Sequence, residues 1–272
     1  MPERRSAFYD FSVSPYSYDF LAFLVAARGQ GCNHVVFVPG ERAYQKCSPA
    51  EQAFRMEHLL IPLASLSGEV TVCKTREEAK QYEPSFPPGY TVDKPTHFHM
   101  LAQVIKLGRL KMIQPSERAR QIVKDLGSPI TITIRETHIK PGRNSNIPEW
   151  IKAAAKSIPN VLFVPDTENV ERDFGFPSYP LAAFDVDVRL ALYERASMNL
   201  GVGNGPMTLC TYGRHPYRML NPLNDAFFES SSEYWKCIGV GKQFPWAKEN
   251  QRIVWKPDTF AAITESLELE TA

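Results

Sequence analysis

The sequence has almost no excess of charge of either sign, and no basic block or stripe runs through it. It holds 31 lysine and arginine residues against 30 aspartate and glutamate residues, which gives a net charge of +1 at pH 7. Proteins that bind the nucleic-acid backbone carry clustered lysine and arginine. We therefore expect no nucleic-acid partner.

Long apolar runs are lacking as well. The first helix expected from the sequence, at residues 18–27, contains Asp19 and is far too short to cross a bilayer. The charged N-terminus, with Glu3, Arg4 and Arg5, is not followed by an apolar core and a small-residue cleavage site. We expect neither a signal peptide nor a transmembrane segment, and we expect a cytoplasmic location.

Cysteine is scarce, with five residues that form no CxxC pair and no regular spacing. A disulfide framework or a zinc knuckle needs tighter spacing than this. We expect reduced and mostly buried thiols. The sequence also lacks a GxSxG elbow, an HExxH helix and a paired Cys/His nucleophile pattern, so no common hydrolase signature is present.

The histidines and carboxylates show no spacing typical of a metal site. His97 and His99 are two residues apart, and no third ligand follows nearby. Asp185 and Asp187 precede a predicted helix and are expected to cap it rather than to hold Mg²⁺. We therefore expect no metal and no cofactor.

What the sequence does contain is a regular alternation of strand and helix patterns. Apolar residues make up 43% and charged residues 22%, which is typical of a globular protein. The alternation predicts an α/β fold with parallel sheets, made of two Rossmann-like domains that face a central cleft. The domains are predicted at 1–115 and 116–272, with a hinge at 108–128, because the alternation restarts at the β-branched strand 130–134.

The first half carries three features that can be compared with a structure. A helix at 17–28 is apolar nearly all round, so we expect it to be buried. An amphipathic helix with apolar residues from Met56 to Leu63 is expected to be kinked or shortened by Pro62. The proline-rich segment 83–96 is expected to be a loop without regular structure. The strands expected in this half are 7–13, 34–38 and 69–73.

In the second half, helix ends are the most specific predictions. Asn146 and Glu149 have the spacing of a capping box, and Asp258 is expected to cap the last helix. The strands expected are 130–134, 161–164, 198–202, 217–220 and 252–255. The buried stripe expected on the helix after Asn146 is Ile151, Ala154, Ala155 and Ile158.

The most informative segment is a glycine-rich turn at 201–208, where a strand leads into a helix that ends at Gly213. Glycine lets a ligand approach the backbone, and Pro206 at the first helical position loses no hydrogen bond. The free N–H groups at a helix start suit a phosphate or diphosphate. A plain strand-to-helix turn is the alternative, since the spacing matches neither GxGxxG nor a P-loop. The residues assigned to binding here are Gly203, Asn204, Gly205, Pro206, Met207 and Thr208.

A second candidate is Arg135 with Glu136, directly after the strand 130–134. Ligands of open α/β sheets bind outside the carboxyl ends of strands, and arginine can hold a diphosphate with two hydrogen bonds. Lys140 and Arg143 follow in a polar loop and add positive charge to the same edge. The alternatives are a salt bridge for Arg135 and solvated loop charges for Lys140 and Arg143.

A third candidate is the aromatic loop 172–184, which holds Phe174, Phe176, Tyr179 and Phe184. Exposed rings in such a loop could stack on a nucleobase. Packing of the loop onto its own domain is the alternative interpretation.

The second half resembles the nucleotide-sugar-binding domain of GT-B glycosyltransferases, in particular the heptosyltransferase-like and fucosyltransferase-like branches. The residues that carry this likeness are the strand ending at Arg135 and the run 189–213, which gives a helix, a short strand, a small-residue turn, a helix and a glycine. In these families the turn lies against the donor's phosphates, and in the fucosyl branch an arginine after the first strand binds the diphosphate. Asn-Gly-Pro stands here where a serine is common, and Thr208 is the substitute hydroxyl.

The resemblance implies a metal-independent glycosyltransferase that moves a sugar from a nucleotide-diphosphate donor to a carbohydrate or glycolipid acceptor. Arg135 and the turn would stabilise the departing diphosphate. A base from the first half, which resembles an acceptor domain in element order, would deprotonate the acceptor hydroxyl, with His97, Glu41 and Asp19 as candidates. A nucleotide-sugar epimerase or hydrolase on the same scaffold, and a non-catalytic nucleotide-sugar or carbohydrate-binding protein, remain as alternatives.

Overall fold

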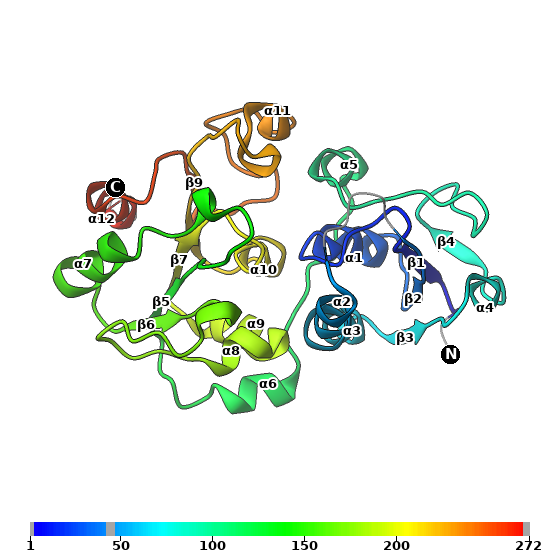
Figure 1. The fold of residues 1–272 in the computed structure, drawn as a ribbon, viewed down its shortest axis with the longest axis horizontal. Helices are drawn as coiled ribbons and strands as arrows, with labels where there is room; N and C mark the ends of the chain where they lie inside the picture. Colours follow the sequence, from blue (N-terminus) through cyan, green and yellow to red (C-terminus); the bar gives the residue numbers. More distant parts are fainter. Residues whose placement is uncertain (1–2, 42–46, 269–272) are drawn as a thin grey trace. The chain divides into compact units, whose positions relative to one another are not determined.

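The structure of the chain is a computed structural model that describes residues 3–41 and 47–268. The chain divides into two compact units, unit 1 (Met1–Gln114) and unit 2 (Pro115–Ala272). Each unit is built on its own parallel sheet, with four strands in unit 1 and five in unit 2 (Figure 1). The predicted α/β class with two parallel sheets is therefore confirmed, whereas the cleft expected between the domains stays a prediction.

Unit 1 has the spatial strand order β3-β2-β1-β4, and every pair of neighbours is parallel. Its two central strands are buried along their whole length, and the polar residues at their ends, Ser6, Asp10 and His34, are hydrogen-bonded. α1 (Phe20–Gly29) is buried from Phe20 to Ala27, as its apolar sequence predicts. The strands are β1 (Ser6–Asp10), β2 (His34–Val38), β3 (Glu69–Val72) and β4 (Pro84–Phe86).

The amphipathic helix of unit 1 changes its hydrogen-bond pattern before Pro62, and the kink expected there stays a prediction. Proline has no N–H to donate to the carbonyl four residues earlier. The chain responds with a π-helical segment directly before the proline-containing helix. The parts are α2 (Pro49–Arg55), the π-helix η1 (Met56–Leu60) and α3 (Ile61–Ser65). Two further helices complete the unit, α4 (Arg76–Ala79) and α5 (Leu101–Leu107).

The prediction of an irregular loop at 83–96 is wrong at residues 84–86. β4 pairs with β1 there, with Ser6 opposite Pro84 and Ala7 opposite Phe86. Proline is tolerated because β4 lies at the edge of the sheet, where only one side of the strand has to pair. Phe86, fully buried, supplies the apolar contact that the loop interpretation did not consider.

Unit 2 has the spatial strand order β6-β5-β7-β8-β9, again with parallel neighbours throughout. Five strands are thus present at the five predicted places. Their bounds are β5 (Ile130–Thr133), β6 (Val161–Val164), β7 (Met198–Val202), β8 (Tyr217–Leu220) and β9 (Gln251–Val254).

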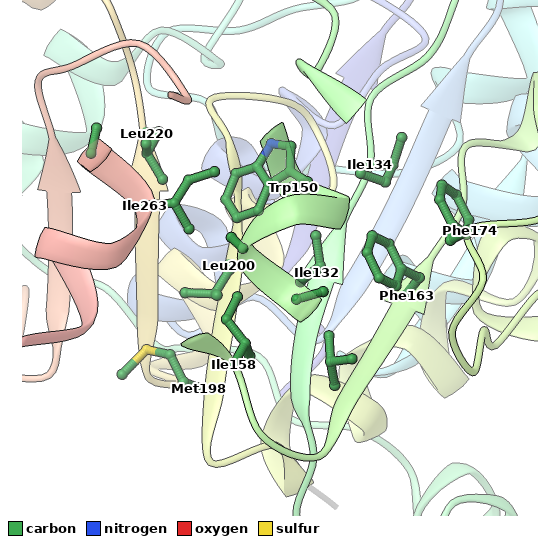
Figure 2. Close-up of a cluster of buried hydrophobic side chains, with 14 residues drawn as sticks. Ile132, Ile134, Trp150, Ile158, Phe163, Phe174, Met198, Leu200, Leu220 and Ile263 are labelled. Carbon is green, nitrogen blue, oxygen red and sulfur yellow. The ribbon is translucent and has the colours of Figure 1, made fainter. Parts of the chain in front are cut away.

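Both faces of this sheet are covered, but in different ways. The isoleucines and threonines of β5 alternate because neighbouring residues of a strand point to opposite faces. Ile132 lies in the apolar core formed with α7 (Ile147–Ser157) and α12 (Phe260–Glu268), where Trp150 is fully buried (Figure 2). On the opposite face, Thr133 is hydrogen-bonded to Tyr193 of α9 at 2.6 Å. The other helical segments are α6 (Glu117–Ile122), η2 (Pro141–Arg143), η3 (Thr167–Asn169), α8 (Leu181–Phe184), α9 (Val186–Arg195), α10 (Thr208–Gly213), η4 (Phe228–Ser230) and α11 (Ser232–Trp235).

The caps predicted for α7 and α12 are wrong, because the two carboxylates bond across to the other helix. At the start of α12 the hydroxyl of Thr259, not Asp258, accepts from the N–H of Ala262 at 3.3 Å. Glu149 of α7 accepts a hydrogen bond from the N–H of Phe260 at 2.6 Å, and Asn146 makes no side-chain cap. Asp258 accepts instead from the N–H of Asn146 at 2.6 Å and from Trp150 Nε1 at 2.8 Å. These carboxylates therefore join the two helices rather than end them.

The buried face of α7 also differs from the predicted stripe. Trp150 and Ala153 are fully buried, whereas Ala155 is exposed and Ile151 is partly buried. Ala154 and Ile158 are buried as expected. Burial of the large ring of Trp150, together with its hydrogen bond to Asp258, determines which face of the helix is buried. Ala155 is exposed as a result.

All five cysteines are unpaired, as predicted, and Cys32, Cys73 and Cys210 are buried. Among the residues that the structure describes, no helix is both long and apolar enough to cross a membrane.

Candidate functional site

The carboxyl ends of β5 and β7 form the topological switch point of unit 2. From β5 the chain moves to β6 on one side, and it then returns to β7 on the other side of β5. Ligands of open α/β sheets bind in the crevice at such a point. Arg135 lies two residues beyond β5, and Gly203 directly follows β7. We call this edge, with loop 135–145, turn 203–208 and Asn221 after β8, the switch-point site.

Arg135 is a buried cation that is held by neutral oxygens. It is 9% exposed, and its guanidinium donates to Ile139 O at 2.5 Å, to Lys140 O at 3.2 Å and to Asn144 Oδ1. Burial, together with the positive charge of Arg143, lowers the pKa of Arg135. The salt-bridge alternative is thus absent among the described contacts of this guanidinium. An anion from outside would stabilise its charged form.

The loop that follows Arg135 is held in a defined shape. Lys140 adopts a left-handed backbone conformation, with φ 53°, which residues other than glycine rarely adopt. The hydrogen bond from Arg135 to the Lys140 carbonyl supports that conformation. Ser145 closes the loop, since its hydroxyl accepts from the N–H of Arg135 at 2.9 Å and its own N–H donates to Arg135 O at 2.8 Å.

Arg143 joins this loop to the glycine turn. Its Nη2 donates to Gly203 O at 2.9 Å, and its side chain is only 16% exposed. Both oxygens of Glu229 accept from Lys140 Nζ, at 2.6 and 2.7 Å, while Arg143 Nη1 lies 3.6 Å from Glu229 Oε2. The interpretation as solvated loop charges therefore does not hold for Arg143. The structure brings Arg135, Lys140 and Arg143 to one edge with the turn, as the strand order requires.

Glu229 is a residue of this site that the sequence analysis missed. It belongs to η4, which follows β8, and lies 89 positions after Lys140. Burial alone would raise the pKa of Glu229, but the hydrogen bond from Lys140 and the charges of Lys140 and Arg143 hold it below its ordinary value. Its carboxylate thus occupies a place beside two of the predicted anion-binding cations.

Glu136 makes an ion pair with Arg172, whose Nε lies 2.5 Å from Glu136 Oε2. Its N–H donates to Asp166 Oδ2 at 3.1 Å. Next to it, His138 Nδ1 lies 2.8 Å from Glu168 Oε2. The structure therefore ties Glu136 and His138 to the segment after β6. The donor-binding role predicted for Glu136 stays a prediction.

The glycine turn uses N–H groups that the sequence analysis expected to be free. Asn204 Oδ1 accepts from the N–H of Met207 at 3.0 Å. The N–H of Thr208 donates to Gly205 O at 3.0 Å, and its hydroxyl donates to the same oxygen at 2.5 Å. α10 consequently begins at Thr208 rather than at Pro206. The N–H groups of Met207 and Thr208 are therefore not free, and the donor-binding role of the turn stays a prediction.

Glycine is required at position 203 by a close approach rather than by a left-handed backbone. A Cβ at this position would lie 2.3 Å from Asn221 Oδ1. The N–H of Gly203 donates to Leu220 O at 2.9 Å and keeps the turn against the end of β8. Any side chain at position 203 would therefore displace Asn221 or break this bond.

The three candidate bases lie in unit 1 on separate segments. Asp19 is exposed and directly precedes α1, where Oδ2 accepts from Ser17 Oγ at 3.0 Å. Glu41 is exposed and lies three residues beyond β2, and His97 is exposed before α5. The role of each as a base stays a prediction.

Carboxylates that were compared with metal ligands serve as caps. Asp185 Oδ1 accepts from the N–H groups of Asp187 and Val188 at 3.1 and 3.0 Å, which confirms its predicted cap of α9. Asp187 instead accepts from the N–H of Ser116 at 2.9 Å and so holds α6. Within residues 3–41 and 47–268, no group of three or more His, Cys, Asp or Glu side chains is arranged to hold a metal ion.

The aromatic loop 172–184 packs onto its own unit. Phe174 is 3% exposed and stacks on Phe163 of β6 with ring centroids 4.5 Å apart. Phe176 also lies against Phe163, at 5.9 Å. The packing alternative is therefore confirmed for these two rings. Phe228, beside Glu229, is by contrast 52% exposed.

No family model and no curated protein matches the chain. Among solved structures, the chain is similar to the ADP-heptose lipopolysaccharide heptosyltransferase II of E. coli, with TM-score 0.43 and 11% identity over 97% of this chain and 74% of that one. It is also similar to a family 9 glycosyltransferase of Veillonella parvula, with TM-score 0.48 and 12% identity over 98% of this chain and 89% of that one.

A third similar structure is the dodecameric iron-containing heptosyltransferase TibC in complex with ADP-D-β-D-heptose, with TM-score 0.47 and 14% identity over 98% of this chain and 76% of that one. TibC comes from enterotoxigenic E. coli. The chain is thus similar, across nearly its whole length, to solved structures of glycosyltransferases, the class that its sequence resembles.

Proposed function

We propose that the chain is a glycosyltransferase and that unit 2 binds the diphosphate of a nucleotide-sugar donor at the switch-point site. The observation that carries this proposal is the grouping of Arg135, Lys140 and Arg143 at the switch point, where the Arg135 guanidinium has neutral partners. A diphosphate diester carries two negative charges and accepts short, charge-assisted hydrogen bonds from such groups.

The same cations would act in the chemical step. Breaking the bond between the sugar and the diphosphate increases negative charge on the leaving oxygen, and fixed positive groups at that oxygen stabilise the transition state. Elsewhere a divalent cation supplies this charge. We therefore propose metal independence, and we expect transfer activity to persist after EDTA treatment. Loss of activity with EDTA and recovery with Mg²⁺ or Mn²⁺ would contradict this part of the proposal.

Unit 1 is proposed to supply the acceptor side, with Asp19, Glu41 or His97 as the base for a carbohydrate or glycolipid hydroxyl. One of the variants Asp19→Asn, Glu41→Gln and His97→Gln should lower kcat by about 10²-fold or more and leave the donor KM near its original value. Equal kcat in all three variants would remove these residues as candidates.

Donor binding is tested with Arg143→Gln, which releases one backbone carbonyl, that of Gly203, whereas Arg135→Ala would release two. We expect Arg143→Gln to weaken binding of nucleoside diphosphates by about 1.5–3 kcal/mol, the range for hydrogen bonds to charged groups. Arg172→Gln, which removes an exposed arginine paired with Glu136, is the matched control and should change affinity less than about twofold. Isothermal titration with ADP, UDP and GDP measures both.

ADP-heptose is the first donor to test, because similar structures hold ADP-D-β-D-heptose or ADP-2-deoxy-2-fluoro heptose. Product analysis then separates the proposal from its alternatives. Sugar transfer that requires an acceptor supports a transferase, free sugar without an acceptor indicates a hydrolase, and a changed sugar on an intact nucleotide indicates an epimerase. Binding without turnover would indicate a binding protein.

A further inference from the structure

Asn221 carries an amide donor that no described residue satisfies. The residue is 2% exposed, and its Nδ2 is buried without a hydrogen-bond partner among residues 3–41 and 47–268. Its backbone, by contrast, is fixed, because its N–H donates to Val254 O at 2.8 Å. A buried amide without a partner lowers the stability of a protein, so such groups are rare.

The position of this amide is the reason to consider a ligand. Asn221 directly follows β8, the strand next to β7, so it lies at the carboxyl edge that holds the glycine turn. Its side chain lies against Gly203, since a Cβ on Gly203 would approach Asn221 Oδ1 to 2.3 Å. The carbonyl of that glycine accepts from Arg143. The amide that carries the unmet donor therefore lies beside Gly203, with its oxygen as the nearest atom.

Two other buried polar side chains of the same sheet differ from each other. The hydroxyl of Tyr217, at the amino end of β8, also has no partner among the described residues, but it lies at the opposite edge from the glycine turn. Asn199 of β7 is fully buried, and its Nδ2 donates to Tyr193 O at 3.0 Å and to Pro216 O at 2.9 Å, while its Oδ1 accepts from Thr131 at 2.6 Å. The sheet thus contains two buried asparagines, one with a complete set of partners and one with an unused donor. Asn199 is therefore a structural residue, whereas Asn221 has an unused donor at the carboxyl edge of the sheet.

We propose that Asn221 is a phosphate-binding residue of the switch-point site, whose Nδ2 donates to a phosphate oxygen of the bound ligand. This inference rests on the proposed function, because it needs an anion at that edge. The proposal requires the turn at 203–207 to move when the ligand binds, because Asn221 is 2% exposed in the unliganded chain. The phosphate oxygen then supplies the acceptor that the unliganded chain lacks, and the bond is charge-assisted.

The experiment compares Asn221→Leu with Asn199→Leu in the full chain, using inorganic pyrophosphate as the probe. Leucine has nearly the shape of asparagine but neither donates nor accepts. We expect Asn221→Leu to weaken pyrophosphate binding about tenfold or more in isothermal titration. Its Tm should stay within about 2 °C of the original or rise, because an unsatisfied buried group is removed. Asn199→Leu should lower Tm by more than about 4 °C and leave the affinity of the folded protein within about twofold.

Asn221→Ala repeats the test without the bulk of leucine. Unchanged affinity in both Asn221 variants would overturn the inference alone, because the original protein would still bind pyrophosphate. An equal loss of affinity in Asn199→Leu would also overturn it, since general loosening of the sheet would then explain the effect. Failure of the original protein to bind pyrophosphate and nucleoside diphosphates would overturn the proposed function itself.

Discussion

The two units both place a charged side chain at the carboxyl end of the first strand of their sheets, but they surround it differently. In unit 1, Asp10 ends β1 and is 1% exposed. Both its oxygens accept from Arg76, at 2.8 and 3.0 Å, and Tyr90 and Ser12 donate to it as well. In unit 2, Arg135 is also buried, at 9% exposed, and donates to neutral oxygens of its own loop.

The pKa values of these groups shift accordingly. Burial alone would raise the pKa of Asp10, but the hydrogen bonds from Arg76, Ser12 and Tyr90 lower it below its ordinary value. The pKa of Arg135 is lowered by burial and by Arg143, so its charge is less stable than in water. A buried charge that is paired with an opposite charge of the same chain stabilises the fold. A buried charge that has only neutral partners favours binding of an anion from outside. The edge of unit 2 is therefore the better candidate for ligand binding.

The largest effect expected from this comparison is on the stability of unit 1. Asp10→Ala removes the acceptor of Arg76, Tyr90 and Ser12. Breaking a buried ion pair by removing one partner typically costs about 3–5 kcal/mol. All four tryptophans lie in unit 2, so far-UV circular dichroism in urea should report the loss, and tryptophan fluorescence should report less of it.

The control for this variant is Glu69→Ala, which breaks the exposed pair between Glu69 and Arg4. Its cost should not exceed about 1 kcal/mol. Equal urea midpoints for Asp10→Ala and Glu69→Ala would show that the Asp10 network does not hold unit 1 together.

Acid should lower the stability of unit 2 because of a buried histidine, His215. Burial lowers its pKa from an ordinary 6.5 to about 4. The unfolded chain therefore binds a proton between pH 6.5 and 4 that the folded chain does not bind, so stability falls as pH falls through this window. A shift of this size corresponds to about 3 kcal/mol.

Tryptophan fluorescence in urea at pH 7 and pH 4 measures this loss in unit 2. Unit 1 has its own buried histidine, His34, whose pKa is also lowered by burial, so a probe confined to unit 2 is needed. In His215→Gln the difference between the two pH values should shrink by most of this amount. A difference that survives unchanged in His215→Gln would assign the acid sensitivity to other groups.

The sequence was sufficient to predict the sheet of unit 2 and the edge that carries the site. β6, β7 and β8 have the predicted bounds. β6 is a continuous apolar run, as expected of a parallel strand that is covered on both faces, and β7 ends at the glycine turn. Arg135 and the turn after β7 lie at one edge because their strands are neighbours, and the carboxyl ends of parallel strands share that edge. Arg143, in the loop after Arg135, makes the contact with the turn. The apolar pattern of each segment predicts the strands, and the position of a residue directly after a strand predicts the edge on which it lies.

The sequence could not predict partners that come from distant segments. Glu149 has the spacing of a cap for its own helix, yet it accepts from Phe260, 111 positions away. Glu229 meets Lys140 across 89 positions, and the unmet donor of Asn221 is visible only once its surroundings are known. These contacts depend on how the packed helices and loops are rotated, and short motifs contain no information on that rotation.

The smallest effect expected concerns Glu229, the carboxylate that pairs with Lys140 at the edge of unit 2. Its carboxylate accepts a hydrogen bond from Lys140 and lies near Arg143, so a bound phosphate must compete with the carboxylate for these two cations. The pair is 40% and 42% exposed, and exposed pairs contribute about 0–1 kcal/mol. Glu229→Gln should therefore tighten pyrophosphate binding by no more than about fivefold, and less in high salt.

Glu233→Gln is the matched control for this last variant, because Glu233 lies on the same segment in an exposed pair with Lys236, and the change in net charge is identical. If the local competition is real, isothermal titration should show tighter pyrophosphate binding for Glu229→Gln than for Glu233→Gln. Equal gains would assign the effect to net charge alone. Weaker binding in Glu229→Gln would mean that the carboxylate supports the ligand, and the edge of unit 2 would then resemble the internally paired edge of unit 1 more closely than its arginines suggest.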